Sequence, residues 1–212
     1  LFAILIALPF GLSVAIYMSE VANSRIRNLL KPIIELLSGI PSVVYGFFGL
    51  IVIVPFIQKV FNLPVGESGL AGSIVLAIMA LPTIITVTED AMRNCPRAMR
   101  EASLALGASQ WQTIYKVVIP YSVSGITSGV VLGIGRAIGE TMAVLMVTGN
   151  AAVIPHTILE PLRTIPATIA AELGEAPAGG AHYEALFLLG VVLFFISLLI
   201  NFTVEAVSAR KR

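Results

Sequence analysis

Long uninterrupted apolar stretches dominate this 212-residue chain, and polar residues collect in the segments between them. A membrane-crossing helix needs about 17–25 mostly apolar residues, because it must cross about 30 Å of hydrocarbon. Five stretches meet this requirement, at residues 1–18, 43–60, 68–88, 122–148 and 184–206. The pattern predicts an all-α integral membrane protein with five transmembrane helices, organised as one domain over residues 1–212.

The first stretch begins at Leu1 and lacks both the basic segment and the small-residue cleavage site of a signal peptide. We therefore expect a true span, preceded in the full-length protein by an extension such as another span.

Residues 24–42 alternate apolar and charged positions at helical spacing and read SRIRNLLKPIIELLSGIPS. The apolar set is Ile26, Leu29, Leu30, Ile33, Ile34 and Leu37, with Arg25, Arg27, Lys31 and Glu35 between them. This pattern predicts an amphipathic helix in the membrane interface. The sequence from Ser38 to Ser42 then breaks the helix, either as an ordinary bend or as an exposed helix start that attracts anions.

Positive charges predict the orientation of the chain, because lysine and arginine collect in cytoplasmic loops. Ten of the 13 lysines and arginines fall on one side of the predicted spans, namely Arg25, Arg27, Lys31, Arg93, Arg97, Arg100, Lys116, Arg210, Lys211 and Arg212. That side, with loop 89–120 and the C-terminus, is expected to be cytoplasmic, and loop 149–183 to be external. The last three residues are expected to anchor this orientation near anionic lipid.

Composition excludes several classes of protein. Only 12% of the residues are charged, about half the usual fraction for a soluble domain, and 57% are hydrophobic. A net charge of +1 gives no electrostatic reason to expect nucleic acid as a partner. One cysteine and two histidines match no metal-ligand spacing, so neither a metal site nor a cofactor is expected. No Walker A sequence is present, so this chain is not expected to hold ATP in a P-loop.

Loop 89–120 predicts two short helices that form an elbow at the membrane surface. Pro96 suits a first helical turn, and Gly107 is a natural stop. Ser109 followed by Gln112 forms a capping box that opens a second helix, which Pro120 is expected to end. The apolar face of this second helix would carry Trp111, Ile114, Tyr115 and Val118. The elbow either fits a groove on a partner or simply joins two spans.

The elbow resembles the EAA loop of ABC importer permeases. Glu101-Ala102-Ser103 is followed after three residues by Gly107, and nine residues later by VVIP, residues 117–120. Serine replaces the second alanine of the motif, but its spacing is intact. The resemblance implies that residues 96–110 form a coupling helix docked on a dimer of cytoplasmic ATP-binding subunits. The implied contact residues are Arg97, Glu101, Ala102, Ser103, Gly107 and Ala108.

Two charges interrupt the fourth apolar stretch. Arg136 lies fourteen residues from the start of stretch 122–148, or about 21 Å along a helix, close to the membrane midplane. Glu140 is one turn further on and is expected to pair with it. An arginine at that depth costs at least about 2.5–3.5 kcal/mol and usually faces a bundle interior or an aqueous path. We therefore favour a functional role over a purely structural salt bridge.

Glycines in the same stretch predict close helix packing. Gly125, Gly129 and Gly133 recur every four residues, as do Gly135 and Gly139. Small residues at this spacing let helix backbones approach each other. A span with one face for close contact and another that presents charges fits an intersubunit translocation path.

A guanidinium matches the oxygens of an oxyanion, but this argument does not select phosphate. The selection comes from a wider resemblance, carried by GIPSVVYGFFGL (39–50), GRAIGETMAVLMVTGN (135–150) and LRTIPATIAAELGEA (162–176). These segments resemble permease subunits of the phosphate-specific ABC importer, of the PstC type rather than its partner PstA. The resemblance implies that Arg136, Glu140 and the adjacent Thr141 lie on the phosphate path.

Loop 149–183 is longer than a simple connection between two spans needs to be, so a function is expected for it. Residues 167–174 are expected to form a short helix stopped by Gly174. The loop either packs as a lid over the spans, or receives an external phosphate-binding protein, or does both.

Together these features predict the permease subunit of an ATP-driven phosphate importer in the cell membrane, paired with a second permease chain. It would catalyse no reaction itself, since ATP hydrolysis belongs to its partner. One alternative is the same architecture for sulfate, molybdate or tungstate. An ion-coupled secondary carrier and a non-transporting membrane scaffold are alternatives of other classes.

Overall fold

The computed structural model describes the backbone of residues 1–209 and the side chains of residues 1–202. Residues 210–212, predicted to anchor the orientation, lie outside the described residues. The elements in order are α1 (Phe2–Ile16), η1 (Tyr17–Val21), α2 (Ser24–Gly39), α3 (Ser42–Phe48), η2 (Gly49–Ile53), α4 (Val54–Phe61), α5 (Gly69–Arg93), α6 (Arg97–Ala105), α7 (Gln110–Thr113), η3 (Ile114–Val118), α8 (Ile119–Gly139), α9 (Met142–Val147), α10 (Ile165–Glu172) and α11 (Ala181–Ala209), where η marks a π-helical turn. The predicted all-helical fold class is confirmed.

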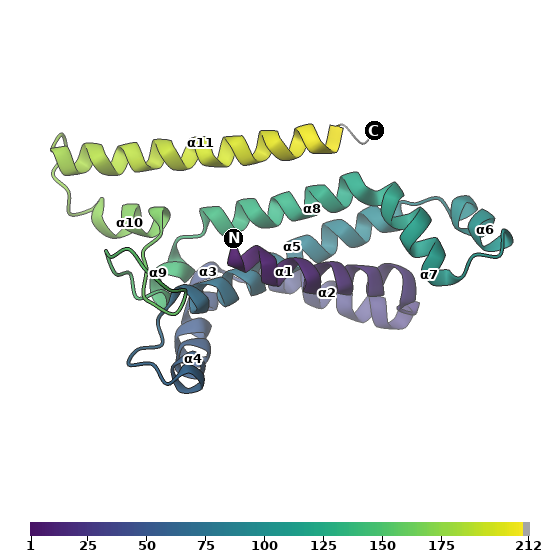
Figure 1. The fold of residues 1–212 in the computed structure, drawn as a ribbon, viewed down its shortest axis with the longest axis horizontal. Helices are drawn as coiled ribbons and strands as arrows, with labels where there is room; N and C mark the ends of the chain where they lie inside the picture. Colours follow the sequence, from purple (N-terminus) through teal and green to yellow (C-terminus); the bar gives the residue numbers. More distant parts are fainter. Residues whose placement is uncertain (210–212) are drawn as a thin grey trace.

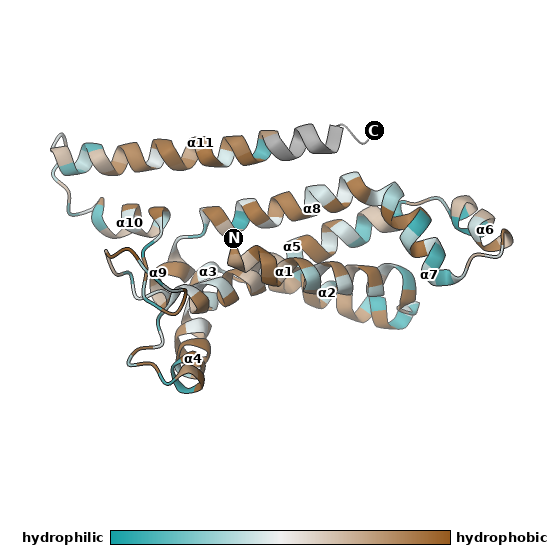
Figure 2. Cartoon of the chain, in the orientation of Figure 1, coloured by the Kyte–Doolittle hydropathy of each residue, from teal (hydrophilic) through white to brown (hydrophobic). Residues whose placement is uncertain are grey.

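Five helical runs are long and apolar enough to cross a membrane. They are Phe2–Val21, Ser42–Phe61, Gly69–Arg93, Gln110–Gly139 and Ala181–Phe202. Four of them coincide closely with predicted stretches. Apolar residues cover the length of these runs, while polar residues gather in the short helices and connections at the ends (Figure 2).

The fourth run differs from the prediction at both ends. It starts at Gln110 instead of residue 122, and Pro120 does not end the preceding helix. Pro120 lies in the first turn of α8, directly after the π-helical turn η3. A proline removes one backbone hydrogen bond, and the wider turn before it lets the helix continue. At the other end α8 stops at Gly139, because Glu140 has extended backbone (φ −72°, ψ 128°).

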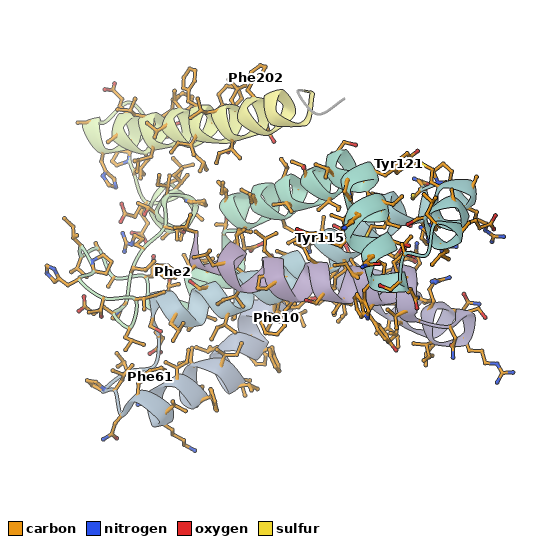
Figure 3. The ribbon with its side chains drawn as sticks, turned by 45° about the vertical axis from the view of Figure 1, so that its right-hand side comes forward. Phe2, Phe10, Phe61, Tyr115, Tyr121 and Phe202 are labelled. Atoms are coloured by element: carbon orange, nitrogen blue, oxygen red, sulfur yellow. The ribbon has the colours of Figure 1, made fainter. Side chains whose placement is uncertain are left out.

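Helices α1, α5 and α8 run side by side and form the body of the bundle (Figure 1). Between α1 and α5, a core of Ala7, Ala77, Ala80 and Ile84 brings the two helices close together. Half of the membrane-crossing stretch of α5 is buried inside the chain, against 6% of α11. Most of the surface of α11 up to Phe202 is therefore left uncovered by the rest of the chain, and aromatic side chains such as Phe10 and Phe202 are exposed as well (Figure 3).

The amphipathic helix predicted between residues 24 and 42 forms as α2, but it does not stay at one end of the bundle. Its Lys31 contacts Glu89 near the end of α5, whereas its Ser38 contacts Arg136 of α8. Figure 1 shows α2 running back alongside α1. The predicted helix is therefore confirmed, and ion pairs and hydrogen bonds hold it against its neighbours. Its location in the membrane interface stays a prediction.

The glycine stripe of α8 faces α5 of the same chain. A methyl group added at Gly125 would overlap the Cβ of Ala91, and one at Gly133 would lie 2.7 Å from Ile84. Gly129 lies between them, against Thr88 and Val87. The contacts step backward along α5 as they advance along α8, so the two helices are antiparallel. Gly135 and Gly139, in contrast, face open space in the described structure.

We expect Gly125→Ala to destabilise the bundle, because its Cβ meets a side chain that cannot rotate away. Forcing one methyl group into a tight core costs about 1–3 kcal/mol. The matched control is Gly135→Ala, on the same helix in open space, which should be neutral or slightly stabilising. The check is the melting temperature of the purified protein in detergent. Equal melting temperatures for the two variants would contradict the packing.

Candidate functional site

Arg136 lies in the last turn of α8, where its guanidinium meets the end of another helix. Its Nη2 donates to the carbonyl oxygen of Ser38 at 3.4 Å. Ser38 lies in the last turn of α2, whose final carbonyls have no intrahelical partner and carry partial negative charge. A helix C-terminus therefore stabilises the cation that the sequence placed inside an apolar stretch.

The expected ion pair between Arg136 and Glu140 does not form in the described structure. Such a pair needs four residues of continuous helix, and α8 ends at Gly139. Glu140 instead accepts a hydrogen bond from the backbone N–H of Ala143 at 3.1 Å, which caps the start of α9. The Thr141 hydroxyl donates to the Gly139 carbonyl at 3.3 Å. Each polar side chain at this break thus satisfies a backbone group that the break exposes.

Arg136 lies within the length of the bundle. Gly133, one turn earlier, packs against Ala80 and Ile84 near the middle of α5. Taking 1.5 Å per residue, the guanidinium-bearing turn is about 12 Å from the start of α5 and about 24 Å from its end. It therefore lies about a third of the way along α5, toward the end of the bundle where α9 and α10 lie (Figure 1).

A second helix break follows directly after Ser38, the hydrogen-bond partner of Arg136. Helix α2 ends at Gly39 and α3 begins at Ser42, with Ile40 and Pro41 extended between them. The hydroxyl of Tyr45, in α3, donates to the carbonyl of Leu37 at 2.7 Å. Two consecutive carbonyls at the end of α2 therefore accept from Tyr45 and Arg136. The role of Tyr45 could not be predicted from the sequence, because its partner is a backbone group.

An open cavity of about 530 Å³ adjoins the break after α8. Gly139 and Thr141 form one wall, and residues of α10, the turn after it and α11 form the others, namely Pro166, Ile169, Ala170, Leu173, Gly174 and Leu193. Arg136 does not line it. The structure thus places Thr141 at a cavity and Arg136 one turn away, on the side of α2.

The elbow forms at the far end of the bundle, around α6 and α7. Gly107 adopts the left-handed conformation (φ 84°), which favours glycine. The capping box is present, since Ser109 Oγ accepts from the amide of Gln112 and the Gln112 side chain accepts from the amide of Ser109. The expected turn and helix start are confirmed.

The apolar face predicted for the second elbow helix is divided. Ile114 and Val118 are buried, with Met92 and Cys95, but Trp111 and Tyr115 are 67% and 72% exposed. The side chains of Arg97, Glu101 and Ala102 are also exposed, as is Gly107, whereas Ser103 bonds with the Thr113 hydroxyl at 2.9 Å. Most of the elbow residues singled out from the sequence are accessible to a partner.

A charge cluster that the sequence did not predict joins α2 to α5. Glu89 is 1% exposed and contacts Lys31 at 2.8 Å and Arg93 at 3.4 Å, while Asp90 contacts Lys31 at 2.5 Å. Burial on its own lowers the pKa of Lys31, but hydrogen bonds to Asp90 and Glu89 outweigh it and place the pKa above its ordinary value. The only signal in the sequence was a carboxylate pair ending an apolar stretch.

Loop 149–183 packs onto the bundle. The first backbone N–H groups of α5 have no intrahelical partner. Gly69 donates to the Glu160 carbonyl at 3.1 Å and Leu70 to the Ile158 carbonyl at 2.8 Å. A hydrogen bond from the His156 amide, with help from Thr157, holds the pKa of Glu160 below its usual range. These contacts favour the lid interpretation of the loop.

The short helix within this loop, α10, starts two residues earlier than expected. Thr164 caps it by accepting from the amide of Ala167, and Pro166 occupies its first turn. An ion pair between Arg163 and Glu172 ties the segment before α10 to the helix end.

Comparison with known proteins identifies relatives over nearly the whole chain. The family model for binding-protein-dependent transport system inner membrane components matches residues 7–212. The probable ABC transporter permease protein YqgH of Bacillus subtilis is 44% identical over 208 residues, which cover 98% of this chain and 67% of that protein. The phosphate transport system permease protein PstC of Mesorhizobium japonicum is 39% identical, covering 93% and 66%. This chain therefore spans about two thirds of the length of these relatives.

Solved structures share the fold at low sequence identity. A chain of the MetNI methionine ABC transporter in an inward-facing conformation aligns with a TM-score of 0.73 and 20% identity, covering all of this chain and 88% of that one. A chain from a crystal structure of an amino acid ABC transporter with histidines aligns with a TM-score of 0.63 and 16% identity, covering 99% and 87%.

We expect Gly107→Ala to loosen the elbow, because the left-handed conformation costs a residue with a Cβ about 1–2 kcal/mol. The open population of the turn should rise about 5- to 30-fold. Hydrogen exchange of the amides from residue 106 to residue 112 measures this change. Gly107→Asn is the control, because asparagine tolerates the same conformation and should exchange more slowly than the alanine variant. Wild-type exchange in Gly107→Ala would show that the positive φ is not required.

Proposed function

The chain belongs to the family of binding-protein-dependent transport system inner membrane components, and we propose that it is the permease subunit of an ATP-driven phosphate importer. It is a multi-pass inner membrane protein and a permease component, not itself catalytic. The proposal concerns its solute, its partners and the roles of individual residues.

The observation that carries the proposal is the pair of helix breaks around Arg136. Broken backbone at membrane depth is tolerated only where it is buried in protein or lines a water-filled path. Transporters use such breaks to bring helix ends and charges to a solute near the middle of the bilayer. Here the guanidinium rests on the end of α2 through one hydrogen bond of 3.4 Å, a long contact that an arriving anion can replace.

A guanidinium offers several donors in a planar fork that suits tetrahedral oxyanions. Glu140 lies just past the break but is held by the start of α9. Arg136 is therefore free of the carboxylate that would otherwise compete with the solute. Thr141 adds a hydroxyl at the wall of the adjoining cavity.

Phosphate is chosen among the oxyanions because of the relatives. Proteins named as phosphate transport system permeases from several bacteria are 34–39% identical to this chain over at least 92% of its length. The relative at 44% identity carries no solute in its name. Sulfate, molybdate and tungstate remain the competing solutes.

In this proposal two cytoplasmic ATPase subunits act on the elbow, through the exposed residues Arg97, Glu101 and Ala102 with Gly107 and Ala108. A second permease chain completes the path, and an external phosphate-binding protein delivers the solute above loop 149–183. The elbow and the C-terminus are then cytoplasmic. ATP binding would drive the change between outward and inward access.

We expect Arg136→Gln to reduce phosphate uptake about 10- to 100-fold, because a charge-assisted hydrogen bond contributes about 1.5–3 kcal/mol. Uptake of labelled phosphate into proteoliposomes that hold the assembled complex measures it. Arg136→Lys should retain part of the activity, and the exposed Lys59→Gln should behave as wild type. An assembled Arg136→Gln complex with unchanged uptake would contradict the role of Arg136.

Competition distinguishes the solutes in the same assay. Excess unlabelled phosphate should abolish uptake, while sulfate, molybdate and tungstate should leave it unchanged. Transport by this chain alone, driven by a proton gradient, would instead establish an ion-coupled carrier.

A further inference from the structure

Arg100 connects the elbow to two spans at once. Its side chain leaves α6 and forms an ion pair with Glu20 of η1, at 2.9 Å between Nη1 and Oε2. Its Nη2 donates to the carbonyl of Met92, in α5, at 2.7 Å. One guanidinium therefore joins three elements, of which η1 lies 80 positions away in the sequence.

Both carboxylate oxygens and the backbone carbonyl of Glu20 accept hydrogen bonds. Its side chain is 7% exposed, and the Ser19 hydroxyl donates to its other carboxylate oxygen at 2.7 Å. The backbone carbonyl of Glu20 accepts from the side chain of Gln110, the first residue of α7, at 3.1 Å. Both helices of the elbow thus bind the same residue at the end of the first span.

Apolar packing also connects the elbow to α1 and α5. Met92, Cys95, Ile114 and Val118 form a buried cluster, and Ile16 of α1 packs against it. The cluster combines residues from the end of α5, the elbow and α1. Because protein interiors are close-packed, they transmit displacement instead of absorbing it.

The ion pair is largely buried, since the side chain of Glu20 is 7% exposed and that of Arg100 is 23% exposed. An exposed ion pair contributes little and opens readily. Removing one partner of a buried pair, in contrast, leaves an uncompensated charge away from water, which is strongly unfavourable. The Glu20–Arg100 pair, with the backbone bonds beside it, is therefore unlike the exposed charges elsewhere on α6.

We propose that Arg100 is a positioning residue that binds the elbow to the first span through Glu20, so that α6 and the end of α1 move as one body when the elbow is displaced. The first span then belongs to the moving part of the permease. This inference rests on the proposed function for its driving force, since it assumes that an ATPase acts on the elbow. It adds a residue and a path of transmission that the EAA resemblance does not include.

The first test is the coupling ratio of the assembled complex in proteoliposomes, measured as phosphate transported per ATP hydrolysed. Arg100→Gln and Glu20→Gln should each lower the ratio by about tenfold or more, as expected for loss of a buried charge partner. The double variant should be no worse than either single variant. Arg100→Lys, which keeps the charge, should recover much of the ratio.

Arg25→Gln is the matched control, an exposed arginine at the start of α2, and should leave the ratio unchanged. A purely structural role for Arg100 would lower assembly and both rates together without changing the ratio. An unchanged ratio in assembled Arg100→Gln would overturn the proposal. If the wild-type complex moves another oxyanion, the solute proposal fails, and the ratio is measured with that oxyanion instead.

The second test replaces the ion pair with a covalent link. Cysteines at positions 20 and 100, in a Cys95→Ala background, remove both charges, so the untreated complex should show the low coupling ratio of the charge variants. Joining the two cysteines with a short bifunctional thiol reagent should restore at least half of the wild-type ratio, because the link again makes the two elements move as one body. A joined complex whose ratio stays as low as that of the untreated complex would overturn the proposal.

Discussion

A backbone N–H or C=O group left unpaired in hydrocarbon costs several kcal/mol, and this constraint organises the whole chain. Each of the five apolar runs is helical, so its backbone N–H and C=O groups pair within the helix. Where the helices stop inside the bundle, at Gly39 and Gly139, side chains and neighbouring carbonyls complete the hydrogen bonding. Arg136, Tyr45 and Glu140 each pair with a backbone group beside a break. These three side chains therefore lie where regular structure is interrupted.

The two ends of the bundle use charge differently. At the elbow, buried carboxylates such as Glu89 and Glu20 are paired with cations from other elements, which fixes these elements to one another. Near the other end, the guanidinium of Arg136 makes one long hydrogen bond, to a helix end, within the part of the chain that the structure describes. A tight network suits transmission of force, and a loosely held cation suits an exchange of partners. The same residue types thus serve two purposes according to how fully they are satisfied.

Sequence reasoning succeeded where local rules decide. The apolar lengths gave the five spans, and the Gly107 turn and the Ser109 capping box followed from local chemistry. It failed where a distant partner decides. The fourth span was drawn through Glu140, because nothing within the apolar pattern marks the break, and the pairing of Glu20 with Arg100 spans 80 positions. The contacts of α2 were missed for the same reason, since Lys31 binds Glu89 and Asp90, which lie 58 and 59 positions away.

Helix α11 has a consequence for how the chain matures in the bilayer. It is apolar on all sides, and only 6% of its membrane-crossing stretch is covered by the rest of the chain. Such a segment is stable in lipid as a lone helix, so insertion can precede association. Its main contacts with the described elements run to α8 and α10. Assembly in the membrane can therefore take place in two steps. The helices around α5 pack together first, and α11 associates with them afterwards.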